Sequence, residues 1–261
     1  MLNDSLQIPV LSLNQLKVSY NRSGKLFNAV NGVSLQLFAG QTMGLVGESG
    51  CGKSSLALAL MKLIPFEGEI LYKNIPLHGL SESDFRPYRQ KIQMIFQNPA
   101  SSLNPKLKIK ESLSEALALG HPKQKSNWQN LIAEKLLEVG LDPDTQLRYP
   151  HEFSGGQLQR IGIARALCVN PEVLICDEPV SSLDVSIQAQ ILELFTFLKA
   201  RHQLSILFIS HDLRVVRYLA DHVAVMHKGA IIENGPTEKV FDAPTETYTK
   251  SLLAAIPPDL N

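Results

Sequence analysis

Residues 42–55 read TMGLVGESGCGKSS and contain the most informative pattern of the chain. TMGLVG at 42–47 predicts a buried strand that runs into a glycine-rich turn, and SSLALALMKLI at 54–64 predicts the helix after it. Between them, GESGCGKS at 47–54 matches the phosphate-binding pattern GxxxxGK[ST] without deviation. Glycines let backbone N–H groups surround phosphate oxygens, and the helix N-terminus adds positive potential. The stretch therefore predicts a nucleotide site at a strand-to-helix turn.

The pattern assigns chemistry to individual side chains of this turn. Lys53 is expected to reach the β- and γ-phosphates, the Ser54 hydroxyl to bind Mg²⁺, and Ser55 to add a phosphate contact. Cys51 lies near a helix N-terminus, which can lower a thiol pKa, but we interpret it as a tolerated small residue. The expected nucleotide-binding residues here are Gly47, Glu48, Ser49, Gly50, Cys51, Gly52, Lys53, Ser54 and Ser55.

A second motif, VLICDE at 173–178, is an apolar strand that ends in two carboxylates. Asp177, at the strand end, can hold the Mg²⁺ shell, and Glu178 can orient or deprotonate a water molecule. An acidic pair after a strand is often only an exposed loop. Because an intact phosphate-binding turn precedes it, we predict a hydrolytic role instead.

A third motif, FSGGQLQR at 153–160, reads as a helix start. Ser154 is a favourable N-cap, and Gly155 and Gly156 expose the first N–H groups of the helix. This geometry predicts a second anion-binding helix N-terminus. A single nucleotide site on this chain would not need it in addition to the turn at 47–54.

The remaining pattern indicates an α/β fold with a largely parallel sheet, because strand-like and helix-like stretches alternate. Residues 11–20 and 30–40 instead alternate apolar and polar side chains, as antiparallel strands do. From Gln97 to about Ala164 a turn-rich segment and two amphipathic stretches, 111–120 and 130–141, predict a helical insertion. Further predictions are a strand at 205–210, a hairpin at 222–235 that turns at Lys228-Gly229, a loop-rich tail, and a helix with the apolar stripe Ile187, Ile191, Leu194, Phe195 and Leu198.

Composition excludes several classes of protein. The 261 residues carry 25 basic and 25 acidic side chains, and 44% are hydrophobic, which excludes a disordered chain. The longest apolar run, at 56–61, is far shorter than the roughly 18 residues of a membrane span, and we expect no signal peptide. Three cysteines without a CxxC pair favour a reducing compartment and argue against a zinc site. Without Lys/Arg blocks, we expect no nucleic-acid partner.

Taken in order, the three motifs resemble those of the nucleotide-binding subunit of an ATP-binding cassette (ABC) transporter, over nearly the full chain. The resemblance implies a P-loop (RecA-like) core with an antiparallel β subdomain, formed by 1–96 and 165–261, and a helical subdomain, 97–164, that carries the signature motif. ATP and Mg²⁺ are the implied cofactors. The implied roles are adenine stacking for Tyr20 (with Phe27 as the competing candidate), contact with Mg²⁺ and water for Gln97, the signature motif for Ser154, Gly155, Gly156 and Gln157, the catalytic carboxylate for Glu178, the D-loop for Asp184 and the switch histidine for His211.

The resemblance also implies partners. Two cassettes would dimerise head to tail, so that the signature residues act in trans, alongside two membrane permease subunits and, indirectly, an extracytoplasmic solute-binding protein. The expected location is the cytoplasmic face of the membrane, as a peripheral subunit. His211 carries an alternative interpretation, since a histidine after a strand can merely cap the next helix.

Three stretches resemble the importer branch for oligopeptides, dipeptides and nickel: 97–105, 176–192 and 235–257. We predict an ATP-hydrolysing importer subunit for peptides whose partner ATPase is a related, different chain. Nickel or a metal chelate is the alternative cargo, and no iron–sulfur cluster is expected because no cysteine follows Cys176. A soluble ABC ATPase of DNA repair or the ribosome, an exporter cassette and a non-hydrolytic regulatory subunit are more distant alternatives.

Overall fold

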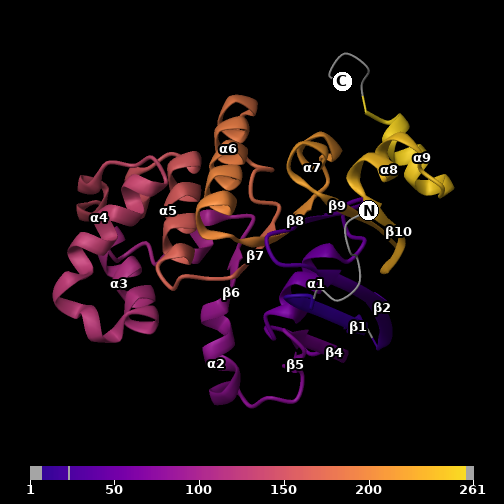
Figure 1. Cartoon of the computed structure of the whole chain (residues 1–261), viewed down its shortest axis with the longest axis horizontal. Helices are drawn as coiled ribbons and strands as arrows, with labels where there is room; N and C mark the ends of the chain where they lie inside the picture. Colours follow the sequence, from indigo (N-terminus) through magenta and orange to yellow (C-terminus); the bar gives the residue numbers. More distant parts are fainter. Residues whose placement is uncertain (1–7, 23, 257–261) are drawn as a thin grey trace. The chain divides into compact units, whose positions relative to one another are not determined.

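The computed structural model describes residues 8–22 and 24–256, which group into two units (Figure 1). One unit consists of the chain up to Phe85 together with the chain from Gln203 onward, and the other is Arg86–His202. The predicted helical subdomain, 97–164, falls inside the second unit. The last five residues of the tail, PPDLN at 257–261, lie outside the described residues.

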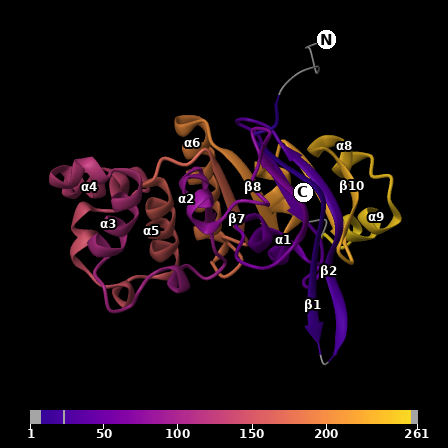
Figure 2. The ribbon, with the colours of Figure 1, turned by 90° about the horizontal axis from the view of Figure 1, so that it is seen from below.

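The first unit contains an antiparallel sheet with the strand order β2-β1-β4-β5. Its strands are β1 (Leu11–Arg22), β2 (Lys25–Leu37), β4 (Glu67–Tyr72) and β5 (Ile75–Pro76). In the second half of β2 the buried residues alternate with exposed ones, because one face of the sheet packs on the core and the other faces solvent. The predicted antiparallel pairing of the N-terminal strands is confirmed, and Figure 2 shows β1 and β2 as a long ribbon.

The same unit contains β3 (Thr42–Val46), β8 (Ser205–Ser210), β9 (His222–His227) and β10 (Ala230–Pro236). Strand β3 lies between β8 and β9 and is parallel to both. Every residue of β3 and β8 is buried, which explains why the two strands are mostly apolar; their polar residues, Thr42, Ser205 and Ser210, lie at the strand ends. The predicted hairpin is confirmed: β9 and β10 are antiparallel, and Lys228 and Gly229 have φ angles of 46° and 84°, as a tight hairpin turn requires.

The helices of this unit are α1 (Lys53–Leu60), α7 (Leu213–Leu219), α8 (Thr237–Asp242) and α9 (Thr247–Ala254). Helix α1 ends earlier than the predicted 54–64, and Lys62 just beyond it has a left-handed φ of 53°. The tail was predicted to be loop-rich, but it forms α8 and α9, which lie beside β10 (Figures 1 and 2). These helices are only 6 and 8 residues long, too short for a clear helical period in the sequence.

Helix α2 (Glu82–Lys91) leads into the second unit, whose strands β6 (Ile92–Ile95) and β7 (Val173–Asp177) are parallel. The other helices are α3 (Ile109–Gly120), α4 (Trp128–Glu138), α5 (Gly155–Leu167) and α6 (Val185–His202), with short 3₁₀ turns at Pro99–Ser102, Pro122–Asn127, Pro143–Leu147 and Pro150–Glu152. Both predicted amphipathic helices are present, as α3 and α4. The sequence did not predict α2, because Phe85 is its one buried residue and gives no apolar period.

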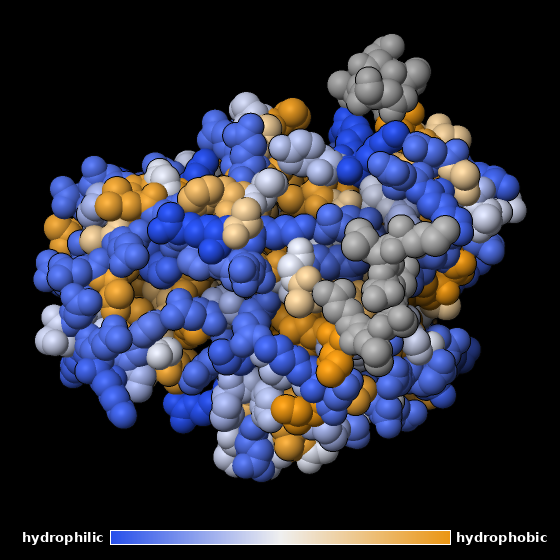
Figure 3. Space-filling model, in the orientation of Figure 1, coloured by the Kyte–Doolittle hydropathy of each residue, from blue (hydrophilic) through white to orange (hydrophobic). Residues whose placement is uncertain are grey.

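The surface is mixed in character. Figure 3 shows hydrophilic residues over most of the visible face, with hydrophobic residues between them in small groups. Scattered apolar residues of this kind are ordinary on a protein surface. Within the described ranges, no helix has both the length and the apolar character needed to cross a membrane.

Candidate nucleotide-binding and hydrolysis residues

The phosphate-binding turn has the backbone that its glycines were expected to permit. Gly47, Gly50 and Gly52 have φ angles of 153°, 81° and 112°. A Cβ on Gly52 would lie 2.1 Å from the carbonyl oxygen of Ala29, and one on Gly47 would lie 2.1 Å from that of Met226. Real Cβ atoms do not approach a backbone oxygen so closely. Only glycine fits these two positions, and Gly52 leads directly into α1.

Lys53 is held at the centre of the turn. Its Nζ donates to the carbonyl oxygens of Gly47 and Glu48 at 2.8 and 2.9 Å, and the residue is only 4% exposed. An ammonium group fixed by two carbonyls is aimed into the turn, where phosphate oxygens can reach it. Burial raises the pKa of the Cys51 thiol, although Lys53 nearby opposes this effect. The thiol is therefore not activated, which agrees with our interpretation of Cys51 as a tolerated small residue.

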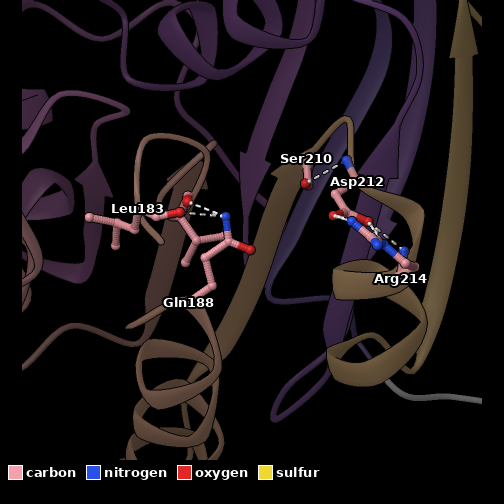
Figure 4. A network of polar contacts seen from close by, with 6 residues as sticks. Leu183, Gln188, Ser210, Asp212 and Arg214 are labelled. Carbon is pink, nitrogen blue, oxygen red and sulfur yellow. Dashed lines mark hydrogen bonds and ion pairs between the residues drawn. The ribbon is translucent and has the colours of Figure 1, made fainter. Parts of the chain in front are cut away.

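His211 lies at the same sheet edge as the phosphate-binding turn. Strands β3 and β8 are parallel with Val46 opposite Ser210, so Gly47 and His211 both follow the carboxyl ends of neighbouring strands. Asp212, not His211, caps α7: its Oδ1 accepts the Arg214 N–H at 2.9 Å (Figure 4). Hydrogen bonds from Arg214 hold the pKa of Asp212 below its usual value. The capping interpretation of His211 is therefore wrong, and the histidine is placed where a contact with phosphate is feasible.

Tyr20 and Phe27 were the two candidates for adenine stacking, and they are register partners on β1 and β2. Both rings are partly exposed, Tyr20 at 37% and Phe27 at 48%. The Tyr20 hydroxyl lies 3.2 Å from Oγ of Ser55, on the first turn of α1. This contact ties Tyr20 to the phosphate-binding turn, and adenine stacking by Tyr20 stays a prediction.

In the second unit, the structure brings together Gln97 and Glu178, which are 81 residues apart in sequence. Strands β6 and β7 are parallel with Ile95 opposite Cys176, so Gln97 and Glu178 follow them at one edge. Nε2 of Gln97 donates to Oε2 of Glu178 at 3.2 Å and to Oγ of Ser181 at 3.4 Å. Glu178 has a left-handed φ of 47°, which sets the direction in which its side chain leaves β7. A carboxylate that accepts a neutral amide hydrogen bond can still accept a proton from water.

Asp177 ends β7 and is 7% exposed. Its carboxylate, the Ser54 hydroxyl and the amide oxygen of Gln97 are each oxygen donors. Hard oxygen ligands of this kind are those that Mg²⁺ prefers, so the residue types fit the predicted ion.

The signature segment forms the predicted helix N-terminus. Ser154 is the N-cap of α5: its Oγ accepts the Gln157 N–H at 3.4 Å, and Oε1 of Gln157 accepts the Ser154 N–H at 3.0 Å. A Cβ on Gly156 would lie 2.6 Å from Cγ2 of Ile187. Gly156 thus lets the start of α5 pack closely on α6, next to the segment that contains Asp184.

Gln188, which no sequence motif indicated, fixes the segment that leads into α6. Its Nε2 donates to the carbonyl oxygen of Leu183 at 2.9 Å (Figure 4) and to that of Val180 at 3.0 Å, and its backbone N–H donates to the carbonyl oxygen of Asp184 at 2.8 Å. These bonds hold the turn that carries Asp184. A sequence signal was present, since Gln188 is an amide residue in the first turn of the predicted helix, four residues after Asp184. Its acceptors could not be predicted, because they depend on the path of the turn at 180–183.

Replacing Gln188 by Ala removes both side-chain donors, and two neutral hydrogen bonds contribute about 1 kcal/mol each. We expect the free energy of unfolding to fall by about 1–2 kcal/mol and ATP turnover to fall several-fold, because the Asp184 turn loosens. Urea unfolding and steady-state hydrolysis measure the two effects. The control is Gln129→Ala, on the exposed surface of α4; equal behaviour of the two variants would contradict the role of Gln188.

The comparisons with known proteins agree with these motifs. A family model described as ABC transporter matches residues 30–181. The dipeptide transport ATP-binding protein DppF of Lactococcus lactis is 47% identical over 253 residues, which is 95% of this chain and 81% of that protein. The oligopeptide transport ATP-binding protein OppF of Salmonella typhimurium is 47% identical over 241 residues, 90% of this chain and 72% of that protein.

A solved structure shares the fold. The dimeric structure of a post-hydrolysis state of the ATP-binding cassette MJ0796, bound to ADP and Pi, has a TM-score of 0.77 and 25% identity, and it covers 87% of this chain and 98% of that chain. This confirms the predicted α/β fold with its antiparallel β subdomain and helices. Together with the phosphate-binding turn and the Gln97–Glu178 pair, these matches show that the chain belongs to the ABC transporter family.

Proposed function

We propose that this chain is the ATP-hydrolysing subunit of an ABC importer for peptides. The observation that carries the proposal is the 47% identity, over most of both chains, to relatives named for dipeptide and oligopeptide transport. An ATPase role agrees with the Gln97–Glu178 contact and with the lysine held inside the phosphate-binding turn. The alternative of a non-hydrolytic regulatory subunit would not need this carboxylate.

Different residues of the chain bind ATP and hydrolyse it. Residues 47–55 bind the phosphates through backbone N–H groups and the Lys53 ammonium, and Tyr20 stacks on the adenine. Glu178 accepts a proton from the attacking water, Gln97 orients Glu178 and the water, and His211 contacts the γ-phosphate. Ser54, Gln97 and Asp177 would hold Mg²⁺, which when bound neutralises charge on the phosphates.

None of these ATP contacts uses the signature residues of this chain. We infer that the α5 N-terminus with Ser154, Gly155, Gly156 and Gln157 acts on ATP bound by a second ABC subunit, and that Asp184 contributes at the same junction. One solved relative is described as dimeric, which supports this arrangement. The partner is a related, different chain.

Two membrane permease subunits complete the complex. Residues 97–164 form the helical subdomain that contacts them, while 1–96 and 165–261 form the rest of one ABC ATPase domain. The chain then works as a peripheral subunit at the cytoplasmic face of the membrane, and a solute-binding protein outside delivers the cargo.

Uptake assays test the proposed cargo. Cells carry the wild-type chain or its Glu178→Gln variant, and uptake of labelled di- and oligopeptides is measured beside uptake of radioactive nickel. We expect the variant to lose peptide uptake and to keep nickel uptake. Selective loss of nickel uptake would replace peptide by metal as the cargo, and no change in either would contradict the proposed importer.

A further inference from the structure

The C-terminal segment contacts the phosphate-binding turn. The hydroxyl oxygen of Tyr248, on α9, accepts the backbone N–H of Glu48 at 3.3 Å, across 200 residues of sequence. Glu48 is the second residue of the turn, and its carbonyl oxygen accepts from Lys53 Nζ at 2.9 Å. Glu48 is therefore held at both of its backbone groups. Tyr248 accepts its N–H, and Lys53 donates to its carbonyl oxygen.

The Tyr248 ring is itself fixed in place. It lies against the ring of His227, at the end of β9, with centroids 3.9 Å apart. Burial raises the pKa of Tyr248, so its hydroxyl is neutral at physiological pH and can accept the Glu48 N–H while keeping its own proton. A half-buried ring packed on a strand end is a rigid support for a single hydrogen bond.

The start of α9 has a separate anchor on β10. Oε1 of Glu233 accepts the backbone N–H and the hydroxyl of Thr245 at 2.7 and 2.9 Å, and Oε2 accepts the Glu246 N–H at 3.2 Å. Burial opposes ionisation of Glu233, but these hydrogen bonds outweigh it and lower its pKa. The carboxylate thus fixes the residues that lead into α9, and with them the position of Tyr248.

We propose that Tyr248 is a positioning residue for ATP binding, which sets the path of the phosphate-binding turn through Glu48 and so aims Lys53. The inference rests on the proposed binding of ATP by residues 47–55. Through this hydrogen bond the C-terminal residues 247–254 contribute to the nucleotide site. Helix α9 thus stabilises the phosphate-binding turn of its own chain through Tyr248.

The test compares Tyr248→Phe with the wild-type chain. The variant keeps the ring on His227 and removes the acceptor of the Glu48 N–H, and one neutral hydrogen bond corresponds to about a two- to tenfold change in an equilibrium constant. We expect KM for ATP in the reconstituted transporter to rise by about that factor, with kcat within twofold of wild type. Tyr218→Phe is the matched control, because that ring is 63% exposed on α7.

Hydrogen–deuterium exchange gives a readout that does not depend on hydrolysis. In the full-length chain, we expect the peptide that contains Glu48 to exchange faster in Tyr248→Phe, and faster also in Glu233→Gln, which loosens the anchor without altering the tyrosine. Unchanged exchange and unchanged KM would overturn the inference, as would a fall in kcat at constant KM. If the wild-type chain binds no ATP, the proposed function fails, whereas the exchange result still decides whether Tyr248 holds the turn.

Discussion

Replacing Glu178 by Gln lowers ATP turnover by the assembled complex about a hundred- to ten-thousand-fold, the usual range for lost general-base assistance. Glutamine keeps the size of the side chain and an acceptor for the amide of Gln97, 3.2 Å away in the wild-type chain. It cannot take a proton from water. ATP affinity is expected to stay near the wild-type value, because the phosphate-binding turn is unaltered.

Single-turnover hydrolysis and equilibrium ATP binding measure the two effects separately. Glu193→Gln, an exposed position on α6, controls for the loss of one negative charge. Hydrolysis by Glu178→Gln at a rate near that of this control would show that another group deprotonates the water. A parallel loss of ATP binding would show that Glu178 has a structural role instead.

Replacing Lys53 by Met weakens ATP binding by at least about ten- to hundredfold, since a hydrogen bond to a charged group contributes about 1.5–3 kcal/mol. Methionine fills much of the same volume but brings no charge to the phosphates. It also removes the Lys53 hydrogen bonds to the carbonyl oxygens of Gly47 and Glu48. The phosphate-binding turn is therefore expected to lose both its charge and part of its internal order.

Titration with a fluorescent ATP analogue measures the affinity, and thermal unfolding checks that the variant is folded. Lys106→Met, in an exposed turn of the second unit, is the control for the loss of a lysine. ATP affinity of Lys53→Met within twofold of this control would exclude the assigned role of Lys53. Loss of affinity in a variant that melts like the wild type would support it.

Much of the site was predictable from local sequence. The glycines of 47–52 permit the positive φ angles of the turn, the strand before them is buried throughout, and Lys53 begins the helix. Ser154 was predicted as an N-cap from its residue type and the glycines after it, and its partner in the structure, Gln157, is only three residues away. In each case the interacting groups are neighbours in the chain, so the residue pattern records the contact.

The sequence determined which residues carry the chemistry, and only the tertiary structure decided which of them meet. Gln97 reaches Glu178 because β6 and β7 are parallel neighbours in one register, and Tyr248 reaches Glu48 because the tail returns past β9 and β10. Local sequence also left open whether His211 caps α7, and the backbone path after β8 places Asp212 at the cap instead. Hydrophobic periodicity and turn residues specify a segment's own conformation, whereas a contact across 81 or 200 residues depends on strand order and register, which no single segment contains.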